Sequence, residues 1–311
     1  MDELVTLFGG GGFLGRYVVQ ELLAAGARVR VAARDPSHAY FLKPLGGLGQ
    51  SQFAVADVTK ADSAMRVAQG STAVINLVGV LSGAFERVHV DGARNAARAA
   101  AKAGAKAFVQ VSAIGADAAA ASAYERTKGL GEQAVRDAFA DATIVRPSIL
   151  FGPEDGFINR FAGMIALAPI VPVVRSSVRF QPAWVGDVAR AIARAALHPR
   201  EHGGKTYELG GPEIVSMEEL NRRIARAIGR TPRLLPVPDG IAAAMARFGG
   251  WLPGAPMTWD QWLMLRQDNV AGANTEGFAA FGIDPTPLAA VAPGYLVRYR
   301  RNGRFGQSAA A

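Results

Sequence analysis

Cysteine is absent from this chain of 311 residues, and histidine is rare. Without cysteine the chain can form no disulfide, no thiol nucleophile and no cysteine-ligated zinc or iron–sulfur centre. The four histidines, at positions 38, 89, 198 and 202, also lack the spacing of a metal site. We therefore expect no metal centre, and the composition is typical of a reducing compartment.

Long apolar runs and a leader segment are also missing. The longest apolar stretch, residues 164–174, is interrupted by Pro169 and Pro172. It is well short of the roughly 20 residues that span a bilayer. The first predicted strand begins at Leu4, with no secretory signal before it. We expect no transmembrane segment and a cytoplasmic location.

Acidic residues are fewer than basic residues in this chain. The chain has 34 lysines and arginines against 26 acidic residues, a net charge of +8. This balance favours anionic partners such as a phosphorylated cofactor or acidic lipid headgroups. The sequence contains no recognisable nucleic-acid-binding module, so we expect no nucleic acid partner.

Glycine, in contrast, is plentiful, and residues 4–16 organise the rest of the chain. An apolar run over Leu4–Phe8 enters a glycine turn, and a helical pattern over residues 17–25 leaves it. Glycine is needed there because a pyrophosphate must approach the backbone amides and the positive end of the helix, where a Cβ would obstruct it. The spacing Gly-x-x-Gly-x-x-Gly predicts a dinucleotide-binding turn. The expected contacts are Gly9, Gly12, Phe13, Leu14 and Gly15.

Apolar runs alternate with helical patterns through the first half of the chain. This alternation predicts an α/β fold with a doubly wound parallel sheet of the Rossmann type. The later strands are expected at residues 28–33, 53–56, 74–78, 108–112, 142–146 and 206–209. The helices are expected at residues 61–69, 91–103, 124–139 and 216–228. We expect a Rossmann core over residues 1–150, with a returning strand near residues 206–210, a small C-terminal lobe over residues 151–295, and a basic tail over residues 296–311.

The end of the second strand indicates which dinucleotide binds. An acidic residue there would hold the ribose 2′-hydroxyl of NAD, whereas arginine accommodates the 2′-phosphate of NADP. Ala33 occupies the acidic position and Arg34 follows it, which favours NADP(H); Asp35 leaves NAD(H) open. Later strand ends should meet the rest of the cofactor. These contacts are expected from Asp57, Val58, Leu77, Val78 and Gly79.

A possible hydride-transfer site follows the fifth strand. Tyr124 and Lys128 lie four residues apart, on one face of a helix, so the ammonium is expected to lower the phenol pKa and to hold the nicotinamide ribose. Ser112 would polarise a carbonyl. We expect all three to be catalytic if the protein is an enzyme, and Tyr124 and Lys128 to contact the cofactor in any case.

These motifs, together with Arg146 and Pro147, resemble the short-chain dehydrogenase/reductase superfamily of extended or atypical type. The resemblance implies that Ser112, Tyr124 and Lys128 form its triad and that Pro147 contacts the cofactor. One departure is Gly11, which stands where a threonine is usual and is expected to loosen the turn.

Residues 146–161, 180–188 and 258–270 resemble more closely the NADPH-binding accessory subunits of respiratory complex I and their bacterial relatives. That resemblance implies tightly held NADPH, complex I subunits as partners, and a mainly structural role where the peripheral arm meets the membrane. The chain would then be peripheral on the inner face of the cytoplasmic membrane.

Two other functions remain open on the sequence. A stand-alone NAD(P)-dependent reductase, dehydrogenase or epimerase would use the same motifs, and so would a regulatory protein that senses NADPH. An apolar group around residues 241–263 would line a substrate pocket, face lipid, or form ordinary core. Arginines and aromatic residues near the C-terminus suit acidic headgroups, a partner protein, or solvent.

Overall fold

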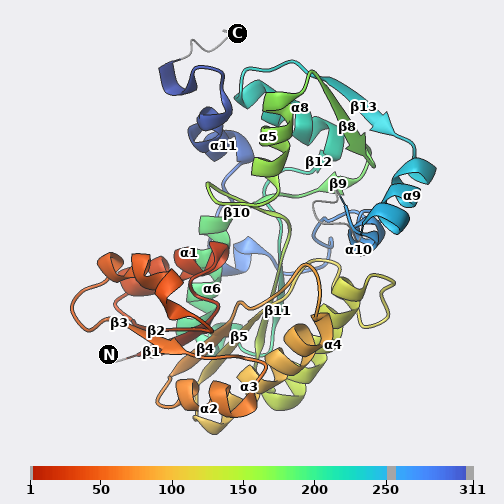
Figure 1. Cartoon of the computed structure of the whole chain (residues 1–311). Coiled ribbons are helices and arrows are strands. Elements are labelled where there is room, and N and C mark those ends of the chain that lie inside the picture. The colour runs from red at the N-terminus through yellow and green to blue at the C-terminus, as the bar shows by residue number, and fades with distance from the viewer. Residues whose placement is uncertain (1–2, 251–256, 306–311) are drawn as a thin grey trace. The chain divides into compact units, whose positions relative to one another are not determined.

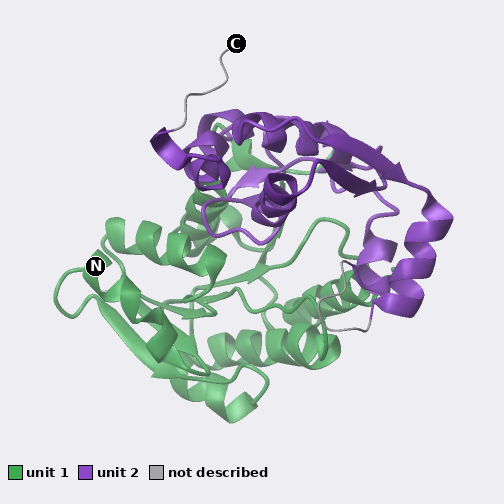
Figure 2. Ribbon diagram, turned by 45° about the horizontal axis from the view of Figure 1, so that its top comes forward, with its two compact units in different colours: residues 1–147, 185–209, 272–284 green, residues 148–184, 210–271, 285–311 purple. Residues whose placement is uncertain are grey.

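The computed structural model describes residues 3–250 and 257–305, which form two compact units. Unit 1 is built from residues 1–147, 185–209 and 272–284, and unit 2 from residues 148–184, 210–271 and 285–311 (Figure 2). Segments far apart in the sequence therefore combine within each unit.

Unit 1 is built on a seven-stranded sheet in which every pairing is parallel. The strand order is β11-β6-β5-β4-β1-β2-β3. The bounds are β1 Leu4–Phe8, β2 Arg28–Ala33, β3 Ser51–Val55, β4 Ala73–Asn76, β5 Ala107–Val111, β6 Thr143–Pro147 and β11 Thr206–Leu209. Because β4 adds to the far side of β1, the winding reverses between these two strands, where open α/β sheets bind their ligands. The predicted doubly wound sheet is confirmed.

Helices cover both faces of this sheet. On one face α1 packs beside α6, and on the other α2, α3 and α4 are successive neighbours (Figure 1). Their bounds, with those of the shorter helices of unit 1, are α1 Phe13–Ala24, η1 Pro36–Leu45, α2 Ala61–Ala68, η2 Glu86–Gly92, α3 Ala93–Lys102, α4 Ala123–Ala138, α6 Val185–Leu197, α7 Pro199–His202 and η3 Phe278–Phe281. Covered on both sides, β1, β4 and β5 are buried along their whole length, which explains their apolar composition.

Several boundaries differ from the prediction for local physical reasons. The strand expected over residues 74–78 ends at Asn76, whose side chain bonds the backbone of the next residues and turns the chain out of the sheet. The helix expected over residues 91–103 begins only at Ala93, because residues 91 and 92 belong to the π-helix η2. β3 begins earlier than expected, at Ser51, because an edge strand tolerates polar residues. α1 begins at Phe13, directly after its N-cap Gly12.

Unit 2 combines three two-stranded sheets with a small helical core. β7 pairs with β10 and β8 with β13 in parallel, and β9 pairs with β12 antiparallel. Residues of α5, α8 and α11 share one apolar cluster. The elements are β7 Leu150–Phe151, α5 Ile158–Leu167, β8 Ile170–Val174, β9 Arg179–Phe180, β10 Ala183–Trp184, β12 Val215–Ser216, α8 Met217–Ala227, β13 Arg233–Val237, α9 Asp239–Gly249, α10 Trp259–Met264, α11 Leu288–Leu296, η4 Val297–Tyr299 and η5 Gly303–Phe305.

The apolar stretch at residues 164–174 is divided between the end of α5 and the strand β8. Over residues 3–250 and 257–305, no helix has both the length and the apolar character needed to cross a bilayer.

The apolar group noted near residues 241–263 is largely at the surface of unit 2. Ile241, Met245 and Phe248, on α9, are 56%, 52% and 73% exposed. Trp262, on α10, is buried and packs with Ala242 and Ala246 of α9. Ordinary core therefore describes Trp262 but not the exposed face of α9. Trp251 and Leu252, from the same predicted group, lie outside the described residues.

Candidate functional site

The glycine turn between β1 and α1 is a close-packed backbone structure. Gly9 has a φ of 83°, in the left-handed region, and its carbonyl oxygen accepts the Gly12 N–H at 3.1 Å. A Cβ built on Gly15 would lie 2.5 Å from the same oxygen. Both positions therefore require glycine, because a side chain at either would distort the turn.

The amino end of α1 presents backbone N–H groups without intrahelical acceptors. Its N-cap, Gly12, has no side chain to cap them, and the first turn contains no acidic residue. The N–H groups of Phe13 and Leu14 belong to the first turn of the helix, which has no preceding carbonyl to pair with. With the positive end of the helix dipole, these donors, which have no acceptor within the helix itself, would suit an anion such as a pyrophosphate.

Gly11, where the resemblance implied a threonine, packs against η1. A Cβ at Gly11 would lie 2.8 Å from the Cβ of Ala39. A threonine there would push η1 away from the glycine turn, so glycine at this position is explained by the close approach of η1.

The end of β2 separates the roles of Arg34 and Asp35. The carboxylate of Asp35 is the N-cap of η1 and accepts the Ser37 N–H at 2.9 Å and the Ser37 hydroxyl at 2.5 Å. These hydrogen bonds hold the pKa of Asp35 below its usual value. Arg34, directly after the strand, is exposed. Asp35 is thus engaged by hydrogen bonds within the turn, whereas Arg34 is exposed.

Asp57 and Val58, after β3, face different surroundings. The Asp57 carboxylate accepts the Thr59 hydroxyl at 2.7 Å and the Thr59 N–H at 3.0 Å, and the hydroxyl bond is the main cause of its lowered pKa. Val58 is buried in the core, and its carbonyl accepts the Asn95 amide at 3.1 Å. Of the two residues predicted to contact the cofactor here, Asp57 has the charged side chain, whereas Val58 is part of the core.

Residues 77–79 lie between the glycine turn and Lys128. Asn76 holds this loop, since its Oδ1 accepts the Val78 N–H at 3.2 Å while its Nδ2 donates to Gln110 at 2.9 Å. A Cβ built on Gly9 would lie 3.3 Å from Cγ2 of Val78. A Cβ on Gly79 would lie 3.2 Å from Nζ of Lys128. The predicted contacts at Gly9 and Val78 are therefore neighbours, as are those at Gly79 and Lys128.

Ser112, Tyr124 and Lys128 lie where α4 meets the end of β5. Lys128 Nζ lies 5.8 Å from the centre of the Tyr124 ring and donates to the Val111 carbonyl at 3.2 Å. Ser112 follows Val111 and is 4% exposed, and its hydroxyl has no hydrogen-bond partner within the described part of the chain. A buried hydroxyl in this condition is normally satisfied by a ligand or an ordered water.

The electrostatics of this pair differ from the expectation. Burial raises the pKa of Tyr124 to about 12, and the negative charge of Glu125 adds to the effect. Burial also lowers the pKa of Lys128 to about 8, opposed by Glu132. The expectation that Lys128 lowers the phenol pKa is therefore wrong for this structure, because burial of the phenol disfavours its charged form. At neutral pH the phenol is protonated, so Tyr124 can donate a proton but is a poor base.

An ionic network fixes α4 against the sheet. Arg146 donates to both carboxylate oxygens of Glu132, at 2.8 and 2.7 Å, and to Glu208 at 3.2 Å. Pro147, the next residue, ends β6, and its carbonyl accepts the Ile114 N–H at 3.1 Å. Pro147 thus lies beside the segment that follows Ser112.

His89 lies beside these residues, although the spacing of the histidines in the sequence predicts no site for it. In η2 its ring nitrogens lie 3.0 Å from the Val80 nitrogen and 3.0 Å from the Thr127 hydroxyl. The sequence carries no signal for it, since a π-helix changes the side-chain spacing on which helix patterns depend. Across the described ranges, no cluster of three or more His, Asp or Glu residues is placed to hold a metal ion.

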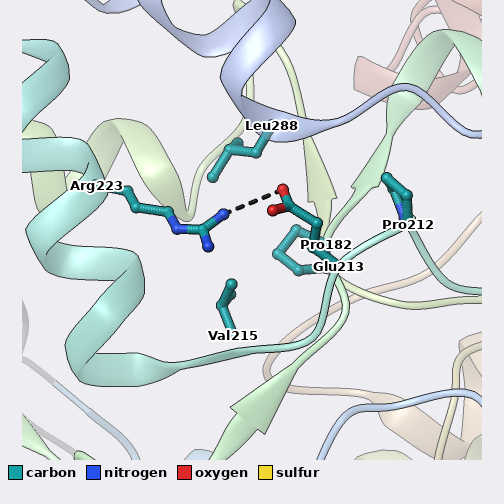
Figure 3. Close-up of a pocket in the computed structure, with 6 residues that line it drawn as sticks. All are labelled: Pro182, Pro212, Glu213, Val215, Arg223 and Leu288. Atoms are coloured by element: carbon teal, nitrogen blue, oxygen red, sulfur yellow. Dashed lines mark hydrogen bonds and ion pairs between the residues drawn. The ribbon is translucent and has the colours of Figure 1, made fainter.

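Two pockets of the described structure lie away from these residues. One, in unit 2, is lined by Pro182, Pro212, Glu213, Val215, Arg223 and Leu288 (Figure 3). Arg223 points across this pocket to Glu213, and the two side chains lie 3.1 Å apart. The space inside the pocket is about 10 Å³, enough for about one water molecule. The other, in unit 1, is lined by residues of α6, α7 and η3. None of the predicted site residues lines either pocket.

The glycine cradle, the uncapped helix end and the unpaired Ser112 hydroxyl fit a nicotinamide dinucleotide on unit 1. These features define a nucleotide-binding protein of the Rossmann class. The chain belongs to the NAD dependent epimerase/dehydratase family, which it matches over residues 5–210.

Curated relatives extend the similarity beyond that family region. NADH dehydrogenase [ubiquinone] 1 alpha subcomplex subunit 9 of Rattus norvegicus is 34% identical over 305 residues, covering 96% of this chain and 80% of the relative. A ceramide reductase of Caulobacter vibrioides is 33% identical over 261 residues, covering 80% of this chain and 78% of the relative. The resemblance read from the sequence is confirmed.

Solved structures agree on the fold. The NADPH-dependent quinone oxidoreductase QOR2 of Escherichia coli, complexed with NADPH, superposes with a TM-score of 0.76 at 20% identity and covers 94% of this chain and 99% of its own. The neighbour supports the fold, and the family supports nicotinamide cofactor binding by the present chain.

Proposed function

We propose that this protein is an NADP(H)-holding accessory subunit of NADH:ubiquinone oxidoreductase, respiratory complex I, with a mainly structural role. The observation that carries the proposal is the extent of the similarity to alpha subcomplex subunit 9, which covers 96% of the chain and hence both units. Similarity confined to the Rossmann core would support cofactor binding alone. Its partners are then the other subunits of complex I.

NADP(H) is proposed in preference to NAD(H) because of the end of β2. Arg34 offers a cation to a 2′-phosphate. The acidic neighbour that would bind a ribose 2′-hydroxyl, Asp35, is held by two hydrogen bonds to Ser37. Gly9, Gly12, Phe13, Leu14 and Gly15 would hold the pyrophosphate, and Asp57, Val58 and residues 77–79 would contact the remainder of the adenosine half and the middle of the cofactor.

In this role Tyr124 and Lys128 act chiefly as clamps on the cofactor, with Ser112 and Pro147 beside them. A bound nicotinamide would supply a hydride donor or acceptor. Tyr124 keeps its proton at neutral pH because its pKa is about 12, which suits a hydrogen-bond donor to a ribose hydroxyl. Lys128, tied to the Val111 carbonyl, provides a fixed donor next to it.

A second candidate function is a stand-alone NAD(P)-dependent reductase, and one specific observation favours it. The ceramide reductase relative covers 80% of this chain, and Ser112, Tyr124 and Lys128 are all present. A protonated Tyr124 is suited to act as general acid toward a carbonyl being reduced, and Ser112 would polarise that carbonyl. Loss of turnover in Tyr124→Phe with NADPH binding retained would favour this function, or an epimerase or dehydrogenase of the same type. Release of a partner by NADPH without turnover would favour a sensor.

The protein is proposed to lie at the inner face of the cytoplasmic membrane, where acidic headgroups meet its C-terminal segment. Arg298 and Arg300 already donate hydrogen bonds within unit 2, to Asn159 and to the Ala227 carbonyl. Arg301 and Arg304 are exposed. Changing both to glutamine should reduce flotation with vesicles that contain acidic lipids, whereas Arg98→Gln, an exposed change on α3, should not. Equal flotation of the two variants would contradict this location.

The experiment that tests the proposed function is native separation of gently solubilised membranes, with mass spectrometry of each band. Migration of the chain with the quinone-reducing complex is the expected result. Migration only as a small species would contradict the accessory role and direct attention to the reductase.

A further inference from the structure

His89 joins two segments of the candidate site that lie far apart in the sequence. Its Nε2 lies 3.0 Å from the nitrogen of Val80, in the loop after β4. Its Nδ1 lies 3.0 Å from the hydroxyl of Thr127, on α4 between Tyr124 and Lys128. His89 is 3% exposed, so both bonds are sheltered from water.

The partners of the ring determine its protonation. The Val80 N–H can only donate, so Nε2 must be an unprotonated acceptor. The Thr127 hydroxyl donates to the Ala123 carbonyl at 2.7 Å, which leaves its lone pairs to accept from Nδ1–H. One neutral tautomer, protonated at Nδ1, therefore satisfies every contact. Burial and the nearby charge of Lys128 agree with this, since they lower the pKa of His89 to about 3.

The surroundings leave little room for the ring to move. It packs edge-to-face against Tyr124, with ring centroids 5.3 Å apart, and in a tilted arrangement against Phe85, with ring centroids 5.5 Å apart. A Cβ on Gly131 of α4 would lie 2.1 Å from the His89 carbonyl oxygen, so only glycine lets η2 approach α4 so closely. A Cβ on Gly79 would lie 3.6 Å from Nε2 and 3.2 Å from Lys128 Nζ. The ring is thus fixed between the loop and the clamp residues.

We propose that His89 is a positioning residue that locks the loop at Gly79 and Val80 onto α4 and so sets how firmly the nicotinamide half of the dinucleotide is held. This inference rests on the proposed function, because it assigns the loop and α4 to cofactor binding. His89 itself touches neither a substrate nor a reacting atom. It acts through the Val80 N–H, the Thr127 hydroxyl and the ring of Tyr124.

The test compares His89→Leu with His89→Gln, whose side-chain oxygen can still accept from Val80. His198→Leu, a change at an exposed histidine of unit 1, is the matched control. Dissociation constants are measured for NADPH and for 2′,5′-ADP, which lacks the nicotinamide half. His89→Leu should weaken NADPH about tenfold, the effect of losing one or two net hydrogen bonds, and leave 2′,5′-ADP unchanged. His89→Gln should recover part of the loss.

Equal affinities of His89→Leu and wild type for NADPH would overturn the inference. So would an equal loss for both ligands, which is what general destabilisation would produce. Exchange of the Val80 amide hydrogen, measured without cofactor, provides an independent readout. It should accelerate in His89→Leu and not in His198→Leu, and unchanged exchange would also overturn the inference. If wild type binds no NADPH while Val80 exchange still depends on His89, the lock stands and the proposed function fails.

Discussion

Gly15 packs against the backbone of Gly9 so closely that a Cβ at Gly15 would lie 2.5 Å from the Gly9 carbonyl oxygen. That oxygen also accepts the Gly12 N–H at 3.1 Å, so the two contacts together shape the turn. The amino end of α1 is oriented by this packing, and the anion site depends on it. Substitutions at these glycines therefore test the cofactor site without altering any charged group.

Gly15→Ala should weaken NADPH binding about thirtyfold or more, because relieving the clash moves the turn and costs about 2 kcal/mol. Gly240→Ala on α9 is the control, since nothing lies within 4 Å of a Cβ built there. Titration of cofactor fluorescence measures both. Similar affinities for the two variants would show that the turn does not hold the cofactor.

Arg34→Ala should weaken NADPH binding about 10-fold to 100-fold while leaving NADH nearly unchanged, because a hydrogen-bonded charge contributes about 1.5–3 kcal/mol. The comparison variant is Arg98→Ala, an exposed arginine on α3. Calorimetry with each dinucleotide gives the two constants. Equal losses of affinity for NADPH and NADH would show that Arg34 does not bind the 2′-phosphate.

Lys128→Met should stabilise the cofactor-free protein at neutral pH by up to about 3 kcal/mol, because burial opposes the charged ammonium. The pKa of Lys128 is about 8 in the folded protein against 10.5 for an ordinary lysine. Below about pH 8 Lys128 is protonated in both the folded and the unfolded protein. The burial of its charge then lowers the stability of the wild type by the full amount.

Between about pH 8 and 10.5 Lys128 loses its proton in the folded protein but keeps it in the unfolded protein, so the destabilisation of the wild type decreases. The difference in unfolding free energy between variant and wild type should therefore shrink as the pH rises from about 8 to 10.5. Urea unfolding across this range measures it. A constant difference would mean that Lys128 is not desolvated.

Glu132→Ala should lower the free energy of unfolding of unit 1 by about 3–5 kcal/mol, because it leaves the Arg146 guanidinium without its bidentate partner. The Glu132 side chain is 2% exposed. Glu219→Ala removes the more exposed bond to Arg223 on α8 and should cost less than about 1 kcal/mol. Comparable midpoints of denaturation for the two variants would contradict the importance of the buried pair.

Sequence pattern predicted the parts of unit 1 that depend on neighbouring residues. The strands Leu4–Phe8, Arg28–Ala33 and Thr206–Leu209 have the predicted bounds, since apolar runs between glycines and polar residues mark buried strands. The end of β4 was missed because it depends on the bond from the Val78 N–H to the Asn76 side chain, which Gln110, on a strand distant in sequence, holds in place.

The pKa values in the candidate site could not be predicted from the sequence, because they too depend on contacts between residues distant in the chain. The pKa of Tyr124 depends on its burial beneath segments that spacing does not reveal. The role of His89 depends on the π-helix that carries it to Val80 and Thr127. Residue types in a motif identify what a site can bind, whereas the protonation of its groups follows from packing.

The most direct test of the central claim is the nucleotide content of the native complex. Complex I is isolated through a tag on another subunit, from cells with the wild-type chain or with Gly15→Ala, and its nucleotides are quantified by mass spectrometry. The account predicts NADP(H) in a fixed ratio to the wild-type chain, with a marked loss in the variant that still assembles. A complex that contains the chain without NADP(H), or equal NADP(H) in both preparations, would contradict it.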